Sequence, residues 1–247
     1  REYEIDYTFF AGKPFFPEFK EFNLATVGYQ ERQIIYRGWD YGFHRPCCLI
    51  TTLNEFDQWC WINCILGKDE GIMDFGRRVR NFCLAEYPGA RYIDADDIAG
   101  TQVSDKSQQT SRQILNALGI YPQGRKQEIN EGAQIIRQKL PIRVDGKPGL
   151  LVNRILTDVI DGFKGGLHYP DIREGQEEKE VYQKDGYYDN IFDPARYISV
   201  QLFTVIGQKE IANEITAEKP ADSNNSLYPN AANESYDTYD NDLSGLL

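Results

Sequence analysis

The residues best suited to chemistry are aspartates, and they form three groups along the chain. Asp40 closes the apolar run IIYRGWD at residues 34–40, the letters DADD follow a short apolar run at residues 94–97, and Asp189 and Asp193 lie in YDNIFDPARY. Crowded carboxylates repel one another unless protons or cations relieve the repulsion. Mg²⁺ and Mn²⁺ prefer oxygen ligands, so acids from several elements predict a two-metal centre of the kind that cuts phosphodiesters.

Each acidic group also has a purely structural interpretation. Asp40 precedes YG and can simply form a turn. In the second group, Asp94 is the first acid after the apolar run, which favours it on strand geometry, although the whole group can be a solvated turn. In the third group, Asp189 can cap a helix and Asp193 can complement the dipole of its first turn.

The charge balance bears on the choice of partner. The net charge is −11, and residues from 207 onward carry eight acids and two bases, which is −6 of that total. Because phosphate binding depends largely on Lys and Arg, a DNA-binding role requires a local basic patch together with metal ions. We prefer the pair Arg125 and Lys126, beside a turn, with Arg143 and Lys147 as further candidates. Other basic candidates are Arg78, Arg80, Arg137 and Lys139.

The elements that must position these acids follow from the apolar pattern. Apolar, aromatic-rich runs at 34–40, 46–53 and 58–66 predict three consecutive antiparallel strands. A helical stripe from Ile72 to Leu84, a strand at 91–94, a helix at 111–118 and a strand at 120–122 follow. Further on we expect a helix at 131–140, a strand ending at Val152, and helices at 154–163 and from about 191 to 205. This order predicts an α/β fold with a mixed sheet flanked by helices.

The same pattern suggests three segments. Residues 1–32 are irregular and predict a linker or edge segment, residues 33–206 a single domain, and residues 207–247 an acidic tail with the composition of a disordered segment. The five cysteines lack paired CxxC spacing and are expected to be buried and reduced. The apolar runs are too short for a membrane span, the chain has no evident targeting leader, and we expect no membrane partner.

Several segments give the chain a resemblance to a known family, the C-terminal nuclease domain of large terminase subunits of tailed phages. The acids stand within GWDYG at 38–42, within DIAGTQ at 97–102, where the family has a DPAG segment, and within DPARY at 193–197, where it often has DALRY. The other similar segments are PFFPEF at 14–19, VDGKPGLLV at 144–152 and FKGGLHY at 163–169. The resemblance runs from about residue 12 to residue 205.

The resemblance implies an RNase H-like fold and metal-dependent cleavage of double-stranded, concatemeric viral DNA during genome packaging, with Mg²⁺ or Mn²⁺ as cofactor. Asp40 matches the first catalytic acid. Alignment on DIAG selects Asp97 as the second, whereas strand geometry favours Asp94, and the third is Asp189 or Asp193. The implied partners are duplex DNA, the portal protein, the small terminase subunit and the ATPase domain of the full-length chain. The implied location is the host cytoplasm, at the procapsid portal.

Two other functions stay open at this point. A resolvase or transposase-type nuclease on the same fold would prefer branched DNA, and a docking module for portal or DNA would have no metal-dependent activity. The chain has no GxxxxGK[ST] phosphate loop, so it is not expected to be a packaging ATPase by itself.

Overall fold

An antiparallel meander forms the centre of the sheet. In this computed structural model, which describes residues 13–101, 109–171 and 180–216, the strands are β2 (Ile34–Asp40), β3 (Cys47–Leu53) and β4 (Trp59–Leu66). They pair in sequence order, with Asp40 opposite Cys47. The three predicted strands are therefore confirmed, each to within one residue.

Three shorter strands extend the sheet on both sides. The strand β5 (Arg91–Ala95) lies parallel to β2, while β6 (Leu150–Asn153) lies parallel to β4 and to β1 (Leu24–Ala25). The order is β1-β6-β4-β3-β2-β5, a mixed sheet, as predicted. Phe15, Phe16 and Phe19 precede β1 and are buried in the core, so this part of the expected linker packs into the fold.

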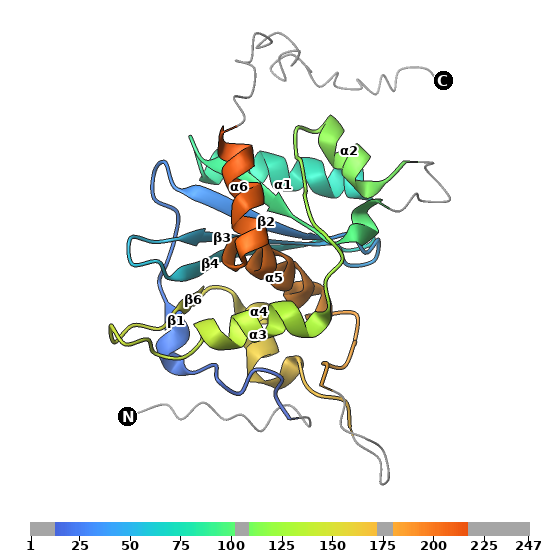
Figure 1. The fold of residues 1–247 in the computed structure, drawn as a ribbon. Helices are drawn as coiled ribbons and strands as arrows, with labels where there is room; N and C mark the ends of the chain where they lie inside the picture. Colours follow the sequence, from blue (N-terminus) through green and yellow to red (C-terminus); the bar gives the residue numbers. More distant parts are fainter. Residues whose placement is uncertain (1–12, 102–108, 172–179, 217–247) are drawn as a thin grey trace, which may run out of the picture. The chain divides into compact units, whose positions relative to one another are not determined.

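Helices cover both faces of the sheet (Figure 1). One face packs against α1 (Ile72–Glu86) and α2 (Ser111–Ala117). The other packs against α3 (Ile129–Lys139), α4 (Thr157–Asp161) and α5 (Tyr188–Phe203). Because alternate residues of a strand point to opposite faces, Trp39 of β2 joins the cluster under α1, whereas Tyr36 joins the cluster under α5.

Gly38 fixes how closely α5 approaches β2. A Cβ atom at this position would lie 2.3 Å from the backbone oxygen of Pro194 in α5. Any larger residue would therefore push the helix away from the strand. Since Gly38 and Asp40 are two residues apart on β2, they face the same side, and α5 passes directly beside the end of the strand that carries Asp40.

Several predicted elements differ in detail. Residues 120–122 form no strand, and only the neighbouring Gln123 makes a parallel bridge, to Ala95. The predicted helix at 154–163 begins at Thr157 as α4 and continues into a π-helical turn from Gly162 to Gly166. The final helix begins at Tyr188, earlier than the predicted start at about residue 191, and Pro194 lies inside it.

The predicted tail also needs a correction. A further helix, α6 (Val205–Thr216), runs through its first ten residues and buries Ile211. Residues 217–247, the rest of that tail, lie outside the described residues. The chain divides into two compact units, Arg1–Ile211 and Ala212–Leu247, and the account below concerns the first. Within the described part of the chain, no helix is long and apolar enough to cross a bilayer.

Candidate metal centre

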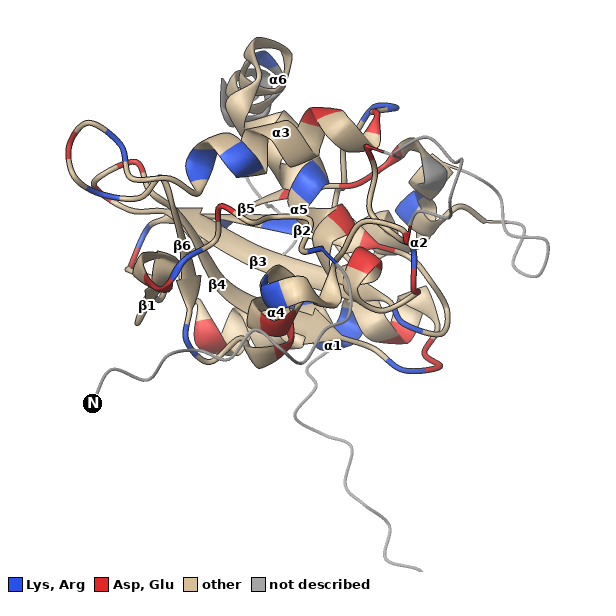
Figure 2. Cartoon of the chain, turned by 90° about the horizontal axis from the view of Figure 1, so that it is seen from below, with Lys and Arg blue, Asp and Glu red and all other residues tan. Residues whose placement is uncertain are grey.

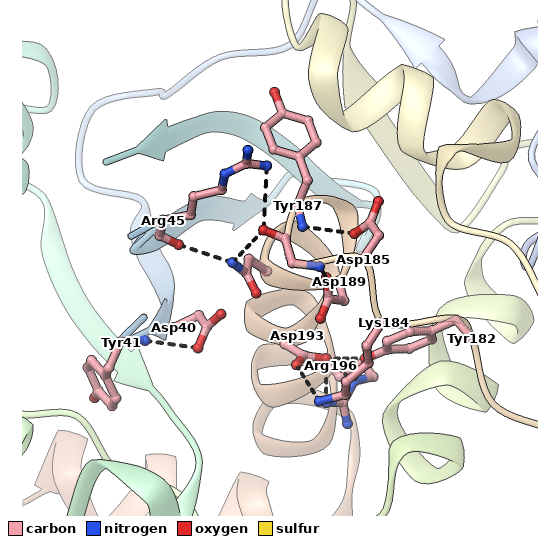
Figure 3. Close-up of polar contacts among 12 residues, drawn as sticks. Asp40, Tyr41, Arg45, Tyr182, Lys184, Asp185, Tyr187, Asp189, Asp193 and Arg196 are labelled. Carbon is pink, nitrogen blue, oxygen red and sulfur yellow. Dashed lines mark hydrogen bonds and ion pairs between the residues drawn. The ribbon is translucent and has the colours of Figure 1, made fainter. Parts of the chain in front are cut away.

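Asp40 stands at the end of β2 on the face covered by α5, and it is partly buried. One of its carboxylate oxygens, Oδ1, accepts a hydrogen bond from the backbone N–H of Tyr41 at 2.9 Å. Burial, followed by the negative charges of Asp193 and Asp189, raises the pKa of Asp40 to about 7. The side chain therefore lies in an acidic environment formed with the first two turns of α5 (Figure 3).

Asp189 is the less neutralised of the two acids on α5. It lies in the first turn of the helix, and its Oδ1 accepts the backbone N–H of Gly186 at 2.7 Å. Burial, a hydrogen bond with Asp185 and the charge of Asp193 raise its pKa to about 6. The residue that caps the helix is Tyr187, so Asp189 is not the N-cap considered from the sequence.

Asp193 lies one turn further along α5 and has cationic partners. Arg196 donates to its Oδ1 at 2.6 Å, the Lys184 Nζ atom lies 3.7 Å from its Oδ2, and the hydroxyl of Tyr182 donates to its Oδ1. Arg196 is itself only 4% exposed. Asp193 is therefore held in a fixed position by a buried network, with one of its oxygens near the more exposed Lys184.

Asp97 lies close to the same end of the sheet. The parallel register pairs Gly38 with Ala95, the last residue of β5, and Asp97 follows two residues later, after the strand has ended. Burial raises the pKa of the Tyr197 phenol, and the charges of Asp193, Asp40 and Asp97 raise it further. Asp97 is therefore near enough to Tyr197 of α5 to act on the same phenol as Asp40 and Asp193.

Asp94 lies on the other face of the sheet and has a structural role. Arg37 donates to both of its oxygens at 2.7 Å, and the Trp39 Nε1–H donates to Oδ1 at 2.7 Å. Asp94 and Arg37 are each about 4% exposed. Asp94 and Ala95 are adjacent on β5, so their side chains point to opposite faces of the sheet, and Asp94 points away from Asp40. We therefore do not include Asp94 in the candidate centre.

Asp96 is paired in a similar way. Arg112 of α2 donates to its two oxygens at 2.6 and 2.8 Å, and the Tyr41 hydroxyl donates at 2.5 Å. The DADD segment thus supplies Asp94 and Asp96 to internal ion pairs, whereas Asp97 is in no ion pair among the described residues.

The four remaining acids, Asp40, Asp97, Asp189 and Asp193, fit a divalent cation by their chemistry. Carboxylate oxygens are the donors that Mg²⁺ and Mn²⁺ take. The raised pKa values of Asp40 and Asp189 reflect burial first and the charges of neighbouring acids second, and a bound cation would offset both. No three His, Cys, Asp or Glu side chains of the described residues already converge into a metal-binding group. The donor set is therefore suitable in type, without a preformed cage.

The basic residues predicted to bind DNA form local contacts of their own. Arg125 forms an ion pair with Glu131, and Lys126 next to it is exposed. Arg143 pairs with Asp145 and donates to the backbone of Phe56 at 2.9 Å, and the Lys147 Nζ atom lies over the Phe56 ring. The turn containing Phe56 joins β3 to β4 at the end of the sheet opposite Asp40.

Positively charged residues are dispersed over the face of the molecule seen in Figure 2. In the view of Figure 2, Lys and Arg are spread over several elements without forming one continuous basic stripe, whereas acidic segments recur on and beside α5.

Sequence reasoning missed the other residues around the acids. Arg45 follows β2, and Tyr182, Lys184 and Asp185 precede α5 (Figure 3). They lie in irregular segments without a periodic pattern, so the only available signal was their short distance in sequence from Asp40 and Asp189.

Known structures share this fold. The chain matches the large terminase of the thermophilic bacteriophage D6E with a TM-score of 0.59 and 14% identity, over 79% of this chain and 47% of that one. It matches the nuclease domain of the P22 large terminase with a TM-score of 0.56 and 12% identity, over 76% of this chain and 91% of that one. The large terminase nuclease of thermophilic phage G20c with bound magnesium gives a TM-score of 0.50 and 14% identity, over 76% and 97%.

These similarities confirm the predicted fold class, an α/β RNase H-like fold of the kind found in terminase nuclease domains. No protein-family profile matches the chain, and no curated protein is similar to it in sequence. The chain spans about half the length of the full-length terminases that it matches.

Proposed function

We propose that the chain is a metal-dependent endonuclease that cuts double-stranded DNA. The observation that carries this proposal is the position of Asp40, whose carboxylate stands at the end of the central strand against Asp189 and Asp193 of α5, with a pKa of about 7. A site of this kind is costly to maintain unless a cation occupies it, and the fold is the one shared with terminase nuclease domains.

In this proposal, Asp40, Asp97, Asp189 and Asp193 hold the metal ions. Bound Mg²⁺ or Mn²⁺ would supply an activated water and stabilise the charge that develops on the phosphate and on the leaving oxygen. Asp40 and Asp189 would hold the cation in their ionised form. Arg196 and Tyr182 keep Asp193 in position through the contacts described above.

The proposed substrate is concatemeric viral DNA, cut during packaging of the genome. The fold similarity to large terminases supports this context. The proposed partners are the ATPase domain of a longer chain, the portal protein and the small terminase subunit, and the proposed location is the host cytoplasm at the procapsid portal. These partners come from the resemblance alone.

Cleavage of supercoiled plasmid by the purified chain in Mn²⁺, Mg²⁺ or EDTA tests the proposal. We expect nicking and linearisation in Mn²⁺ or Mg²⁺ and none in EDTA. Asp40→Asn should lower the rate by on the order of 100-fold or more, because even residues that only orient metal ligands contribute ~10- to 100-fold. The matched control is Asp74→Asn on α1, where the side chain is 71% exposed, and it should cut like the unmodified chain.

The other functions predict different results in the same assay. Faster cutting of a four-way junction than of a linear duplex would favour a resolvase-type enzyme. A folded chain that binds DNA or portal protein but cuts neither substrate in any metal would overturn the nuclease proposal and favour a docking module.

A further inference from the structure

Two cationic side chains border the acidic group, and both are absent from the basic patches predicted above. Arg45 lies in the loop between β2 and β3, five residues after Asp40, and Lys184 lies in the segment before α5. Figure 3 shows Lys184 against Asp193, and Arg45 at the start of α5 with its guanidinium toward Tyr187. They come from different parts of the chain and are brought to the same site by the packing of α5 on β2.

Arg45 is exposed but held in place. Its guanidinium carbon lies 4.8 Å from the centre of the Tyr187 ring, and its Nη1 donates to the backbone oxygen of Gly186 at 3.5 Å. The Asn190 side chain donates to the Arg45 backbone oxygen at 3.4 Å. Among the described residues, Arg45 forms no ion pair with a carboxylate, so its positive charge is not neutralised by a partner.

The loop that carries Arg45 is itself anchored. Backbone N–H groups of Gly67, Asp69 and Glu70 donate to the carbonyl oxygens of Pro46, His44 and Phe43 at 2.7, 3.0 and 3.1 Å. These bonds tie the loop to the segment between β4 and α1. A side chain on such a loop can be presented to a ligand in one orientation, with little ordering cost on binding.

Lys184 is the second cation. Its side chain is 60% exposed, and its Nζ atom lies 3.7 Å from Asp193 Oδ2. The positive charge of Lys184 also lowers the pKa of Asp40. Lys184 therefore interacts electrostatically with both Asp193 and Asp40. A long, exposed Lys side chain at this distance is loosely held and can exchange a carboxylate partner for a phosphate.

We propose that Arg45 and Lys184 are phosphate-binding residues that hold the DNA backbone at the acidic centre. The inference rests on the proposed function and names the residues that recognise its substrate. A polyanion can enter an acidic site only if cations compensate the repulsion, and backbone contacts of this kind position DNA without reading its sequence. Arg143 and Lys147, at the opposite end of the sheet, cannot supply these contacts at the centre.

Binding of a linear duplex by the full chain, in Ca²⁺ in place of Mg²⁺ and over a series of NaCl concentrations, tests the proposal. The test variant is Arg45→Gln with Lys184→Gln. The matched control is Arg143→Gln with Lys147→Gln, which also removes one Arg and one Lys and changes the net charge equally. Thermal unfolding of both variants verifies that they fold.

The two variants should differ in both affinity and salt dependence. Each lost phosphate contact lowers the slope of log K against log salt by about 0.9 and weakens binding by roughly fivefold to tenfold at ~0.1 M salt. We therefore expect the Arg45 and Lys184 variant to bind several tens of times more weakly, with a slope smaller by about 2. The control should change by less than about twofold.

Equal losses in the two variants, or an unchanged slope for the first, would overturn the assignment of Arg45 and Lys184. The separate plasmid assay distinguishes this from failure of the proposed function. If the unmodified chain cuts DNA while the slope is unchanged, the nuclease stands and the phosphate-binding assignment fails. If the slope falls but the unmodified chain cuts nothing, the phosphate-binding residues belong to a DNA-docking module.

Discussion

On the face of the sheet covered by α1 and α2, Asp94 and Asp96 each meet an arginine that donates to both carboxylate oxygens. On the face covered by α5, Asp40 and Asp189 have no such partner among the described residues, and their pKa values are raised to about 7 and about 6. All four acids lie within or near the same few strands and helices, so composition does not separate them.

The difference between the two faces separates acids that stabilise the fold from acids that are available to a ligand. A buried ion pair satisfies its own charges and hydrogen bonds, and it has no need of a cation. An acid that is crowded by other acids reduces stability when it ionises, and this is how functional sites commonly differ from the rest of a protein. Three measurements can break or sharpen this comparison.

The largest effect is expected for Asp94→Ala. The substitution leaves the Arg37 guanidinium buried and without its charged partner, and we expect it to lower the free energy of unfolding by about 3–5 kcal/mol. Urea denaturation followed by circular dichroism measures the change. The exposed Asp74→Asn is the control and should change stability by less than about 0.5 kcal/mol. A loss as small as that of the control would show that the Arg37–Asp94 pair is not a structural element.

The opposite sign is expected for Asp40→Asn in metal-free buffer. Because the pKa of Asp40 is about 7 in the folded chain and 3.8 is its ordinary value, the folded state binds more protons than the unfolded state between about pH 4 and pH 7. Stability therefore falls as the pH rises through this window. The Asn variant lacks this loss. A rise of about three in pKa corresponds to about 4 kcal/mol, and solvent screening of this partly buried side chain lowers that figure, so the variant should be more stable by roughly 2 kcal/mol at pH 8 and nearly unchanged at pH 4.

Thermal unfolding in EDTA at the two pH values measures this difference. If the Asn variant were destabilised at pH 8, or if its effect were the same at both pH values, the ionised Asp40 would not be a source of strain in the folded chain. The comparison between the two faces of the sheet would then lose its main support.

The smallest effect is expected for metal binding itself. A ligand that binds only the folded state, at ten times its Kd, stabilises that state by about 1.4 kcal/mol. Mn²⁺ or Mg²⁺ should therefore raise the melting temperature of the unmodified chain by a few degrees at pH 8. The increase should be smaller at pH 6, where Asp40 and much of Asp189 are protonated. Asp189→Asn should reduce it, and an equal rise in that variant would exclude Asp189 as a ligand.

Much of the fold could be predicted because hydrophobic periodicity is a local property. The strands β2, β3 and β4 end within one residue of their predicted bounds, and α1 and α2 were also correctly located. The prediction was wrong where the local sequence pattern is ambiguous. Residues 120–122 form a short segment that ends in Pro122, which has no backbone N–H to donate to a neighbouring strand. The helix α5 continues through Pro194 because its packing against Gly38 outweighs the local preference for ending there.

The candidate site was predictable only as a list of acids. The sequence by itself determined that aspartates cluster at the ends of apolar runs and that Asp40 closes a central strand. Only the tertiary structure decided that Asp94 pairs with Arg37, that Asp40 faces the acids of α5, and that Lys184 approaches Asp193. The physical reason is that the direction of a side chain depends on strand register and its charged partners come from distant segments, so neither is recorded in a local pattern.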